Sequence, residues 1–199
     1  LPTNCFETFP FPQNISLLLE SKLERLGEEY HEFRYQLMLN LQLGLTKTYN
    51  QFHNAQLISE IASSEVASSG KTNRKELEKK FGKDTFYLWN HLNKTPEACS
   101  MEEAVEGIIK LRQLHKEMDK TVLEAYGWHI DSDDGPSIDL KHDFYEVDYL
   151  PENDRIRYTI SPEARREVLK RLLLLNHKIY DEEVKEGLHD KKGSKKSTS

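Results

Sequence analysis

Cysteine is scarce in this chain of 199 residues, which contains only Cys5 and Cys99. Two cysteines far apart do not form the disulfide framework of a small secreted domain, so we expect a reducing compartment and a cytoplasmic protein. No apolar run approaches the roughly 20 residues that a membrane-spanning helix needs. The sequence therefore argues against an integral membrane protein and against a disulfide-stabilised fold.

The motifs of the common catalytic sites are also missing. The sequence has no Gly-x-Gly cluster after a strand, no Gly-rich phosphate loop ending in Gly-Lys-Ser, and no Pro-Pro dipeptide. Four histidines fall in or beside predicted helices without the spacing of zinc ligands, and we interpret them as packing or surface residues. They are His53, His91, His115 and His177. We expect this chain to hold no catalytic residue, metal or cofactor of its own.

Two short acidic or basic patterns resemble functional sites only in part. The run Asp131–Asp134 lacks the spacing of a calcium loop and its distal glutamate, so a solvated turn is favoured. Glu78-Lys79-Lys80 matches only the end of a nuclease motif. An independent nuclease or hydrolase is therefore the least favoured of the functions considered.

The net charge of −6 argues against nucleic-acid binding over the whole surface. Lysines nevertheless gather with Gly and Ser at the C-terminal end, residues 188–199. This composition predicts a disordered, solubilising tail, with weak phosphate contact as the alternative.

Two long amphipathic helices are the main prediction for the fold. Ser16 is a suitable N-cap for a helix that reaches about Leu43, with Gly44 as its C-terminal stop. Ser100 and Glu103 form a capping box for a second helix of similar length, which ends at Gly127. The apolar positions of the first helix follow a heptad-like spacing, at Leu19, Leu23, Leu26, Tyr30, Phe33, Leu37 and Leu41. We expect an antiparallel pair.

Shorter elements are predicted between and after these helices. Leu45–Asn54 has the composition of a compact turn, Gln56–Ser69 has helical spacing, and Ser68–Glu76 is a candidate loop. One or two short helices are expected over Glu76–Leu92, with these side chains inward: Phe81, Phe86, Trp89 and Leu92.

The C-terminal third of the chain predicts a β-hairpin and a last helix. Two strand-like runs, Phe144–Tyr149 and Ile156–Ile160, flank a polar loop. Ser161 and Pro162 then begin a helix that ends near Lys185. The predicted fold class is mainly α, a coiled-coil-like bundle of long antiparallel helices with one small β-hairpin.

The N-terminal segment CFETFPFP, Cys5–Pro12, contains two Phe-Pro pairs, which exclude a helix interior. We expect an extended strap anchored by three docking rings, Phe6, Phe9 and Phe11. The chain starts with Leu1 rather than Met, so we expect it to be the C-terminal part of a larger protein.

Three clusters mix aromatic, amide and basic side chains in the way a DNA-backbone contact would. The candidate contact residues are Lys47, Tyr49, Asn50, His53, Arg74, Lys75, Arg155 and Arg157. For the first cluster, the alternative is a structural corner between helices, with Tyr49 and Phe52 buried.

Four blocks occur in an order that resembles one protein family. They are CFETFPFP (Cys5–Pro12), GLTKTYNQFHN (Gly44–Asn54), LRQLHKEMDKTVLEAYGW (Leu111–Trp128) and RYTISPEARREVLKRLLLLNHKIYDEEV (Arg157–Val184). Together they resemble the C-terminal region of bacterial restriction-modification and BREX-type adenine-specific DNA methyltransferases, which are similar to the type IIG class.

The resemblance implies a division of the chain. Residues 1–13 would be the exit strap from a preceding target-recognition domain, residues 14–128 a helical spacer, and residues 129–187 the hairpin with a helix packed on that spacer. S-adenosylmethionine and the catalytic motif would belong to the parent protein, and this piece would align its modules and contact DNA weakly. The alternative is a helical protein–protein interaction module of a phage-defence complex, and the long helices also allow a homodimer.

Overall fold

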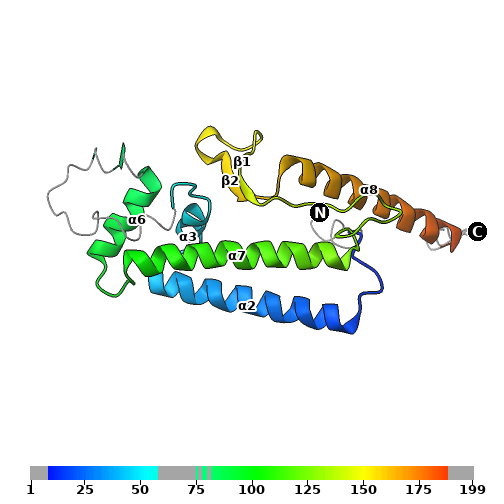
Figure 1. Cartoon of the computed structure of the whole chain (residues 1–199), viewed down its shortest axis with the longest axis horizontal. Coiled ribbons are helices and arrows are strands. Elements are labelled where there is room, and N and C mark those ends of the chain that lie inside the picture. Colours follow the sequence, from blue (N-terminus) through cyan, green and yellow to red (C-terminus); the bar gives the residue numbers. More distant parts are fainter. Residues whose placement is uncertain (1–8, 58–74, 76–77, 80–81, 188–199) are drawn as a thin grey trace, which may run out of the picture.

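Two long helices lie side by side along most of the computed structural model, which describes residues 9–57, 75, 78–79 and 82–187 (Figure 1). They are α2 (Leu17–Leu41) and α7 (Met101–Ala125), each 25 residues long. The chain is mainly helical, and its one described sheet is a two-stranded antiparallel hairpin, which confirms the predicted fold class.

Contacts at both ends show that α2 and α7 are antiparallel. Near the start of α2, Lys22 Nζ lies 2.7 Å from Glu124 Oε2 at the end of α7. At the other end, the Cys99 N–H donates to the Asn40 carbonyl oxygen at 2.8 Å, just before α7 begins. The predicted capping box is confirmed, because Ser100 and Glu103 exchange both hydrogen bonds.

The apolar seam of α2 is buried mainly toward its C-terminal half. Its buried residues are Leu26, Tyr30, Leu37 and Leu41. They join a core with α7 that includes Val105, Ile108 and Leu111. The periodicity therefore identified the correct face, although Leu19 and Leu23 at the start of the helix are only half-buried.

The end of α2 differs from the prediction. The helix stops at Leu41, and Gln42 rather than Gly44 takes the left-handed conformation, with φ of 50°. The side-chain amide of Gln42 donates to the Leu39 carbonyl oxygen at 2.9 Å, which helps to satisfy a helix-terminal acceptor. Gly44 instead precedes the next helix as its N-cap.

Leu45–Asn54, expected to be a compact turn, contains the α-helix α3 (Leu45–Phe52), so that prediction was wrong. One face of α3 is buried through Thr48, Gln51 and Phe52, at the spacing of helical neighbours. Tertiary burial of this face stabilises a helix of only eight residues, which would be marginal alone.

A short helix, α6 (Lys83–Lys94), follows with Thr85, Leu88 and Leu92 buried. Phe86 and Trp89, expected to point inward, are only half-buried. Phe81 lies outside the described residues, as do residues 58–74, which carry most of the predicted Gln56–Ser69 helix and of the loop after it.

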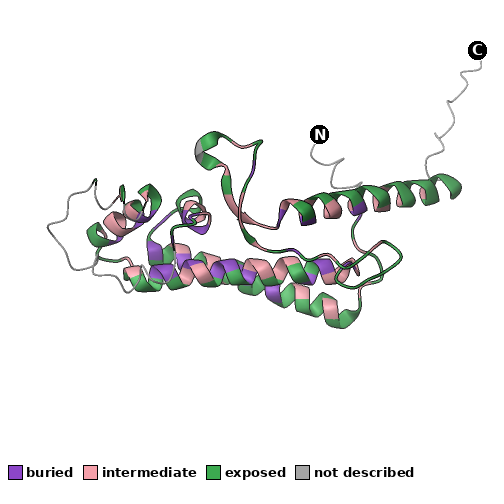
Figure 2. Cartoon of the chain, turned by 45° about the horizontal axis from the view of Figure 1, so that its top comes forward, coloured by how far each residue is buried: buried purple, intermediate pink, exposed green. Residues whose placement is uncertain are grey.

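The structure confirms the hairpin and the last helix, although the first strand ends at Glu146, before the predicted Tyr149. Strands β1 (Asp143–Glu146) and β2 (Ile156–Thr159) pair with Phe144 opposite Tyr158, and the 3₁₀ helix η2 (Glu152–Asp154) lies in the connection. Ser161 caps α8 (Pro162–Lys185). The hairpin lies across α7 from α2, and the start of α8 packs near the C-terminal end of α7 (Figures 1 and 2). No described helix has the length and apolarity to span a membrane.

Candidate functional site

A polar groove of about 660 Å³ lies between α3, α6 and the hairpin. Four of the eight residues predicted to contact DNA line it: Lys47, Asn50, His53 and Arg157. Lys47 and Asn50 lie on α3 and His53 is its C-cap, whereas Arg157 comes from β2. The fold thus unites residues separated by more than one hundred positions in the sequence.

Helix α6 forms the opposite wall of the groove with Lys83, Asp84 and Tyr87. The Lys47 ammonium lies 4.8 Å from the centre of the Tyr87 ring, in a cation–π arrangement that links α3 to α6. Tyr87 in turn stacks on His91, with ring centres 6.2 Å apart. This side of the groove therefore carries the Lys47 ammonium over the face of the Tyr87 ring, next to solvent.

The charges around the groove are balanced. Its basic side chains are Lys47, Lys83 and Arg157, and its acidic side chains are Asp84, Glu152 and Asp154. Arg157 lies 3.4 Å from Asp154 Oδ1, so one cation is already partly neutralised. Such a groove attracts a polyanion far less than a uniformly basic surface does.

His53 lies at the junction of the groove and the core. Its Nδ1 accepts the Tyr158 backbone N–H at 3.2 Å, which leaves Nε2 as the protonated nitrogen of the neutral ring. Burial, followed by the positive charge of Arg157, lowers the pKa of His53 to about 4. His53 is therefore a neutral hydrogen-bonding group at physiological pH, not a phosphate-binding cation.

Arg112, on α7, holds the backbone that follows α3 at the base of the groove. Its guanidinium donates to four carbonyl oxygens, those of Gln51, Phe52, Asn54 and Leu57, at 2.9–3.1 Å. The same group lies over the rings of Phe144 and Tyr158 in the hairpin. Burial lowers the Arg112 pKa to about 10, which still leaves it charged at neutral pH. One side chain thus ties α3, the hairpin and α7 together.

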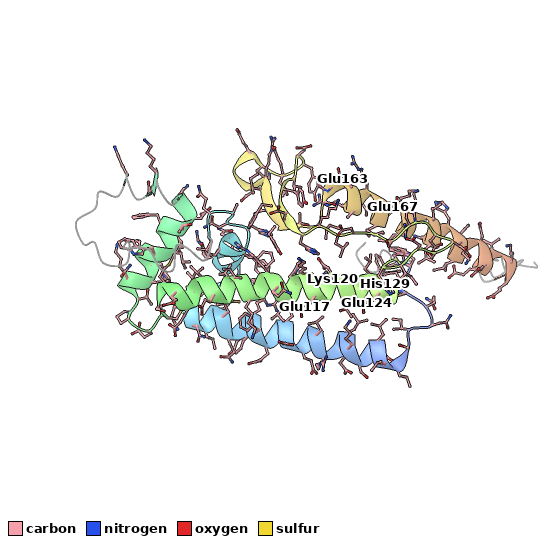
Figure 3. All side chains as sticks on the ribbon, in the orientation of Figure 1. Glu117, Lys120, Glu124, His129, Glu163 and Glu167 are labelled. Carbon is pink, nitrogen blue, oxygen red and sulfur yellow. The ribbon has the colours of Figure 1, made fainter. Side chains whose placement is uncertain are left out.

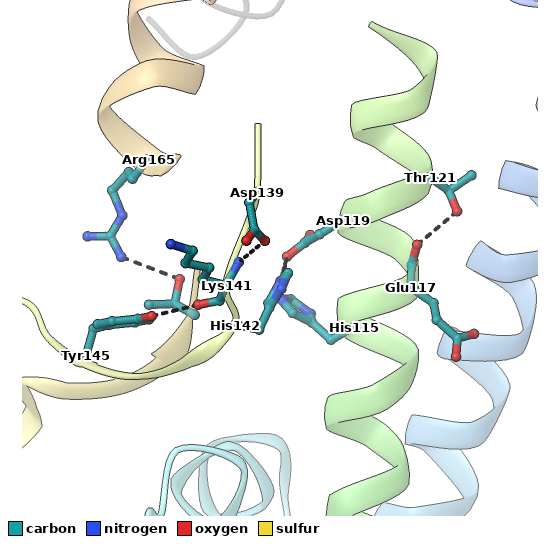
Figure 4. Close-up of polar contacts among 10 residues, drawn as sticks. His115, Glu117, Asp119, Thr121, Asp139, Lys141, His142, Tyr145 and Arg165 are labelled. Atoms are coloured by element: carbon teal, nitrogen blue, oxygen red, sulfur yellow. Dashed lines mark hydrogen bonds and ion pairs between the residues drawn. The ribbon is translucent and has the colours of Figure 1, made fainter. Parts of the chain in front are cut away.

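Two histidines and an aspartate, His115, His142 and Asp119, form a cluster between α7 and the segment before β1 (Figure 4). His142 Nε2 donates to Asp119 Oδ2 at 2.8 Å, and His115 Nε2 lies 3.6 Å from the same oxygen. The Nδ1 atoms of both rings are buried without a hydrogen-bond partner among the described residues. No group of three metal-ligating side chains in the described ranges is arranged to hold a metal ion. We interpret the cluster as a link between α7 and the segment before β1.

The remaining predicted contact residues do not line the groove. The Tyr49 hydroxyl lies 2.7 Å from that of Tyr30 on α2, so Tyr49 belongs to the helix interface, as the corner interpretation expected. Arg155 lies 3.7 Å from Glu146 and donates to the Leu150 carbonyl within the hairpin. Lys75 is exposed, and Arg74 lies outside the described residues.

The described part of the N-terminal strap lies at the other end of the molecule. The Tyr126 hydroxyl donates to the Pro10 carbonyl oxygen at 3.1 Å, and the rings of Phe9 and Phe11 contact each other edge to face. Both rings remain more than 40% exposed and border an apolar groove of about 630 Å³ with Trp128. Phe6 lies outside the described residues.

Sequence reasoning missed Arg112, Lys83 and Tyr87. A helical spacing does place Lys83, Tyr87 and His91 on one side of α6, which is a usable signal. No sequence signal marked Arg112, because it occupies a buried position in an otherwise ordinary amphipathic helix. No protein-family model matches the chain, and neither the curated proteins nor the solved structures contain a match to it.

Proposed function

We propose that this chain is the C-terminal helical region of an S-adenosylmethionine-dependent, adenine-specific DNA methyltransferase of a restriction-modification or phage-defence system. Its role is to align the recognition and catalytic modules and to contact the DNA backbone. The observation that carries the proposal is the convergence of Lys47, Asn50, His53 and Arg157 on one groove. Cofactor and catalytic groups belong to the parent protein.

The antiparallel pair suits an aligning role. Each helix is about 37 Å long at 1.5 Å per residue, and the two pack over much of that length. A methyltransferase must bring an extruded adenine into its pocket, so the distance between recognition and catalytic modules has to be fixed. Packed helices fix such a distance better than a flexible linker does.

The groove suits a weak backbone contact. Lysine, arginine and amide side chains donate to phosphate oxygens without reading base sequence. Because three acidic side chains offset the three basic ones, binding should be weak, sensitive to salt and independent of DNA sequence. The strap residues Phe9 and Phe11 supply the apolar surface for a neighbouring module.

The test has two parts. Fluorescence anisotropy with unrelated duplexes at low salt should show weak binding of equal strength, and Lys47→Ala or Arg157→Ala should weaken it. Lys120→Ala is the matched control, because Lys120 is exposed on α7 and does not line the groove (Figure 3). Equal losses in the control and the groove variants would contradict the groove assignment.

The second part concerns the gene. Its reading frame should contain a Gly-rich cofactor loop and an Asn-Pro-Pro-Tyr-type motif upstream of this chain, and truncating the chain should abolish methylation. Site-specific methylation that survives truncation would refute the aligning role.

A protein–protein interaction module is the second candidate, favoured by one observation. The exposed side of α8 carries several large apolar residues, and DNA contact does not account for them.

A further inference from the structure

Helix α8 carries an apolar seam that the rest of the described chain leaves exposed. Leu169, Leu173, Tyr180 and Val184 are spaced by four, seven and four residues, which places them within about 60° of one another around the helix. Their exposed fractions are 59, 58, 51 and 47%. We call these four residues the α8 seam.

The opposite flank of the same helix is held by the protein. Val168 and Leu172 pack against the small core formed by Leu123, Trp128 and Leu140. Arg171 is buried and donates to the Pro136 carbonyl oxygen, with Glu167 as its ion-pair partner. Helix α8 is therefore anchored along its first half with the seam turned outward, and exposed positions continue to its end (Figure 2).

The charges of α8 are divided between its two halves. From Pro162 to Leu173 there are four basic and two acidic side chains, a net charge of +2. From Leu174 to the C-cap Glu186 there are two lysines and four acids, a net charge of −2. A parallel pair of such helices would place like charges together, whereas an antiparallel pair places each basic half against an acidic half.

We propose that the α8 seam binds the α8 seam of a second copy of this chain in an antiparallel pair. The pair is isologous, because a two-fold axis near the middle of the helix repeats the same contacts at both ends. Asn176 borders the seam near that axis, and a polar residue at such a position favours one register and one orientation. This surface is separate from the polar groove, so the proposal does not depend on the proposed function.

The pair should be weak. A helix of 24 residues offers a contact about 36 Å long and one side chain wide, which falls at the small end of specific interfaces. We therefore expect a monomer at low micromolar concentration and a growing dimer fraction at a few hundred micromolar.

Sedimentation velocity of the full chain over that concentration range tests the proposal. Leu173→Glu should weaken dimerisation by about tenfold or more, because it places a charge in the apolar contact twice per dimer. Leu174→Glu is the matched control: Leu174 is also 58% exposed on the same helix but points about 100° away from Leu173. The control should dimerise as the wild type does, and circular dichroism should show the same helix content for both variants.

Charge reversal tests the antiparallel orientation. Lys170→Glu and Asp181→Lys, one in each half, should each weaken the dimer about two- to fivefold. The double variant leaves both halves with a net charge of zero, so it should dimerise no more tightly than either single variant. A chain that stays monomeric at every concentration, as it would if α8 served a different partner, overturns the proposal. Equal effects of Leu173→Glu and Leu174→Glu, or single charge variants that dimerise as tightly as the wild type, would also overturn it.

Discussion

The Nε of Arg112 on α7 donates to the carbonyl oxygen of Phe52, the last residue of α3, at 2.9 Å. The positive charge interacts favourably with the negative, C-terminal end of the α3 dipole. The bond also satisfies a helix-terminal carbonyl oxygen that has no partner within α3. Since α3 carries Lys47 and Asn50, this bond also fixes the position of the groove relative to α2 and α7. The position of the candidate site therefore depends on one buried side chain outside it.

Arg112→Lys should destabilise the chain by about 2 kcal/mol or more, because a lysine cannot reproduce the planar fork that reaches four carbonyl oxygens. Urea unfolding followed by circular dichroism measures the loss. Arg166→Lys is the control, because Arg166 is 75% exposed and its pair with Glu163 should contribute less than about 1 kcal/mol. Equal effects of the two substitutions would contradict the structural role of Arg112.

Two helical glycines give a matched test of how closely α2 and α7 pack. A Cβ added at Gly107 on α7 would lie 2.5 Å from Cδ1 of the buried Leu37, whereas one added at Gly27 on α2 meets nothing within 4 Å. Gly27→Ala should stabilise the chain by about 0.5–1 kcal/mol through helix propensity. Gly107→Ala should lose that gain and become destabilising by about 1 kcal/mol, because Leu37 has to move. Equal stabilisation by both substitutions, measured by urea unfolding, would show that the helices lie farther apart.

The stability of the chain should depend on pH through His53. Its folded pKa of about 4 lies below the usual value near 6.5, so between these two pH values the unfolded state binds more protons than the folded state. The free energy of unfolding should therefore fall as pH drops from 6.5 to 4, and the contribution of His53 should be complete above pH 6.5. Because the ring is partly exposed, we expect on the order of 1 kcal/mol.

Urea unfolding at several pH values measures this dependence. His115 adds to it in the same direction, because burial lowers its pKa as well. Between pH 4 and 6.5, the free energy of unfolding should depend less steeply on pH in His53→Asn than in the wild type. An unchanged slope would mean that His53 titrates alike in the folded and unfolded chain.

Capping residues and apolar periodicity predicted the long helices well. Ser16, Ser100 and Ser161 all accept the expected N-terminal hydrogen bonds. The error at α3 has a clear cause: eight residues with a polar composition have little intrinsic helicity, and Arg112 and the buried face of α3 stabilise them from outside the segment. A local pattern cannot contain that information.

The candidate site was predictable in part. Residue chemistry identified Lys47, Asn50, His53 and Arg157 as a possible set, and the fold brought them to one groove. The same reasoning also selected Tyr49, which lies in the helix interface, because an aromatic ring suits a core as well as a binding surface. It did not identify the three acids of the groove, since surface carboxylates are common along the whole chain.

The salt dependence of DNA binding tests the central proposal, that the polar groove contacts the DNA backbone, most directly. For the wild-type chain, the logarithm of the binding constant should fall linearly with the logarithm of salt concentration, with a slope equivalent to about two or three phosphate contacts. Lys47→Ala should reduce the magnitude of that slope by about one, and Lys120→Ala should leave it unchanged. A wild-type chain without measurable DNA binding at low salt, or a slope that Lys47→Ala does not alter, would contradict the account.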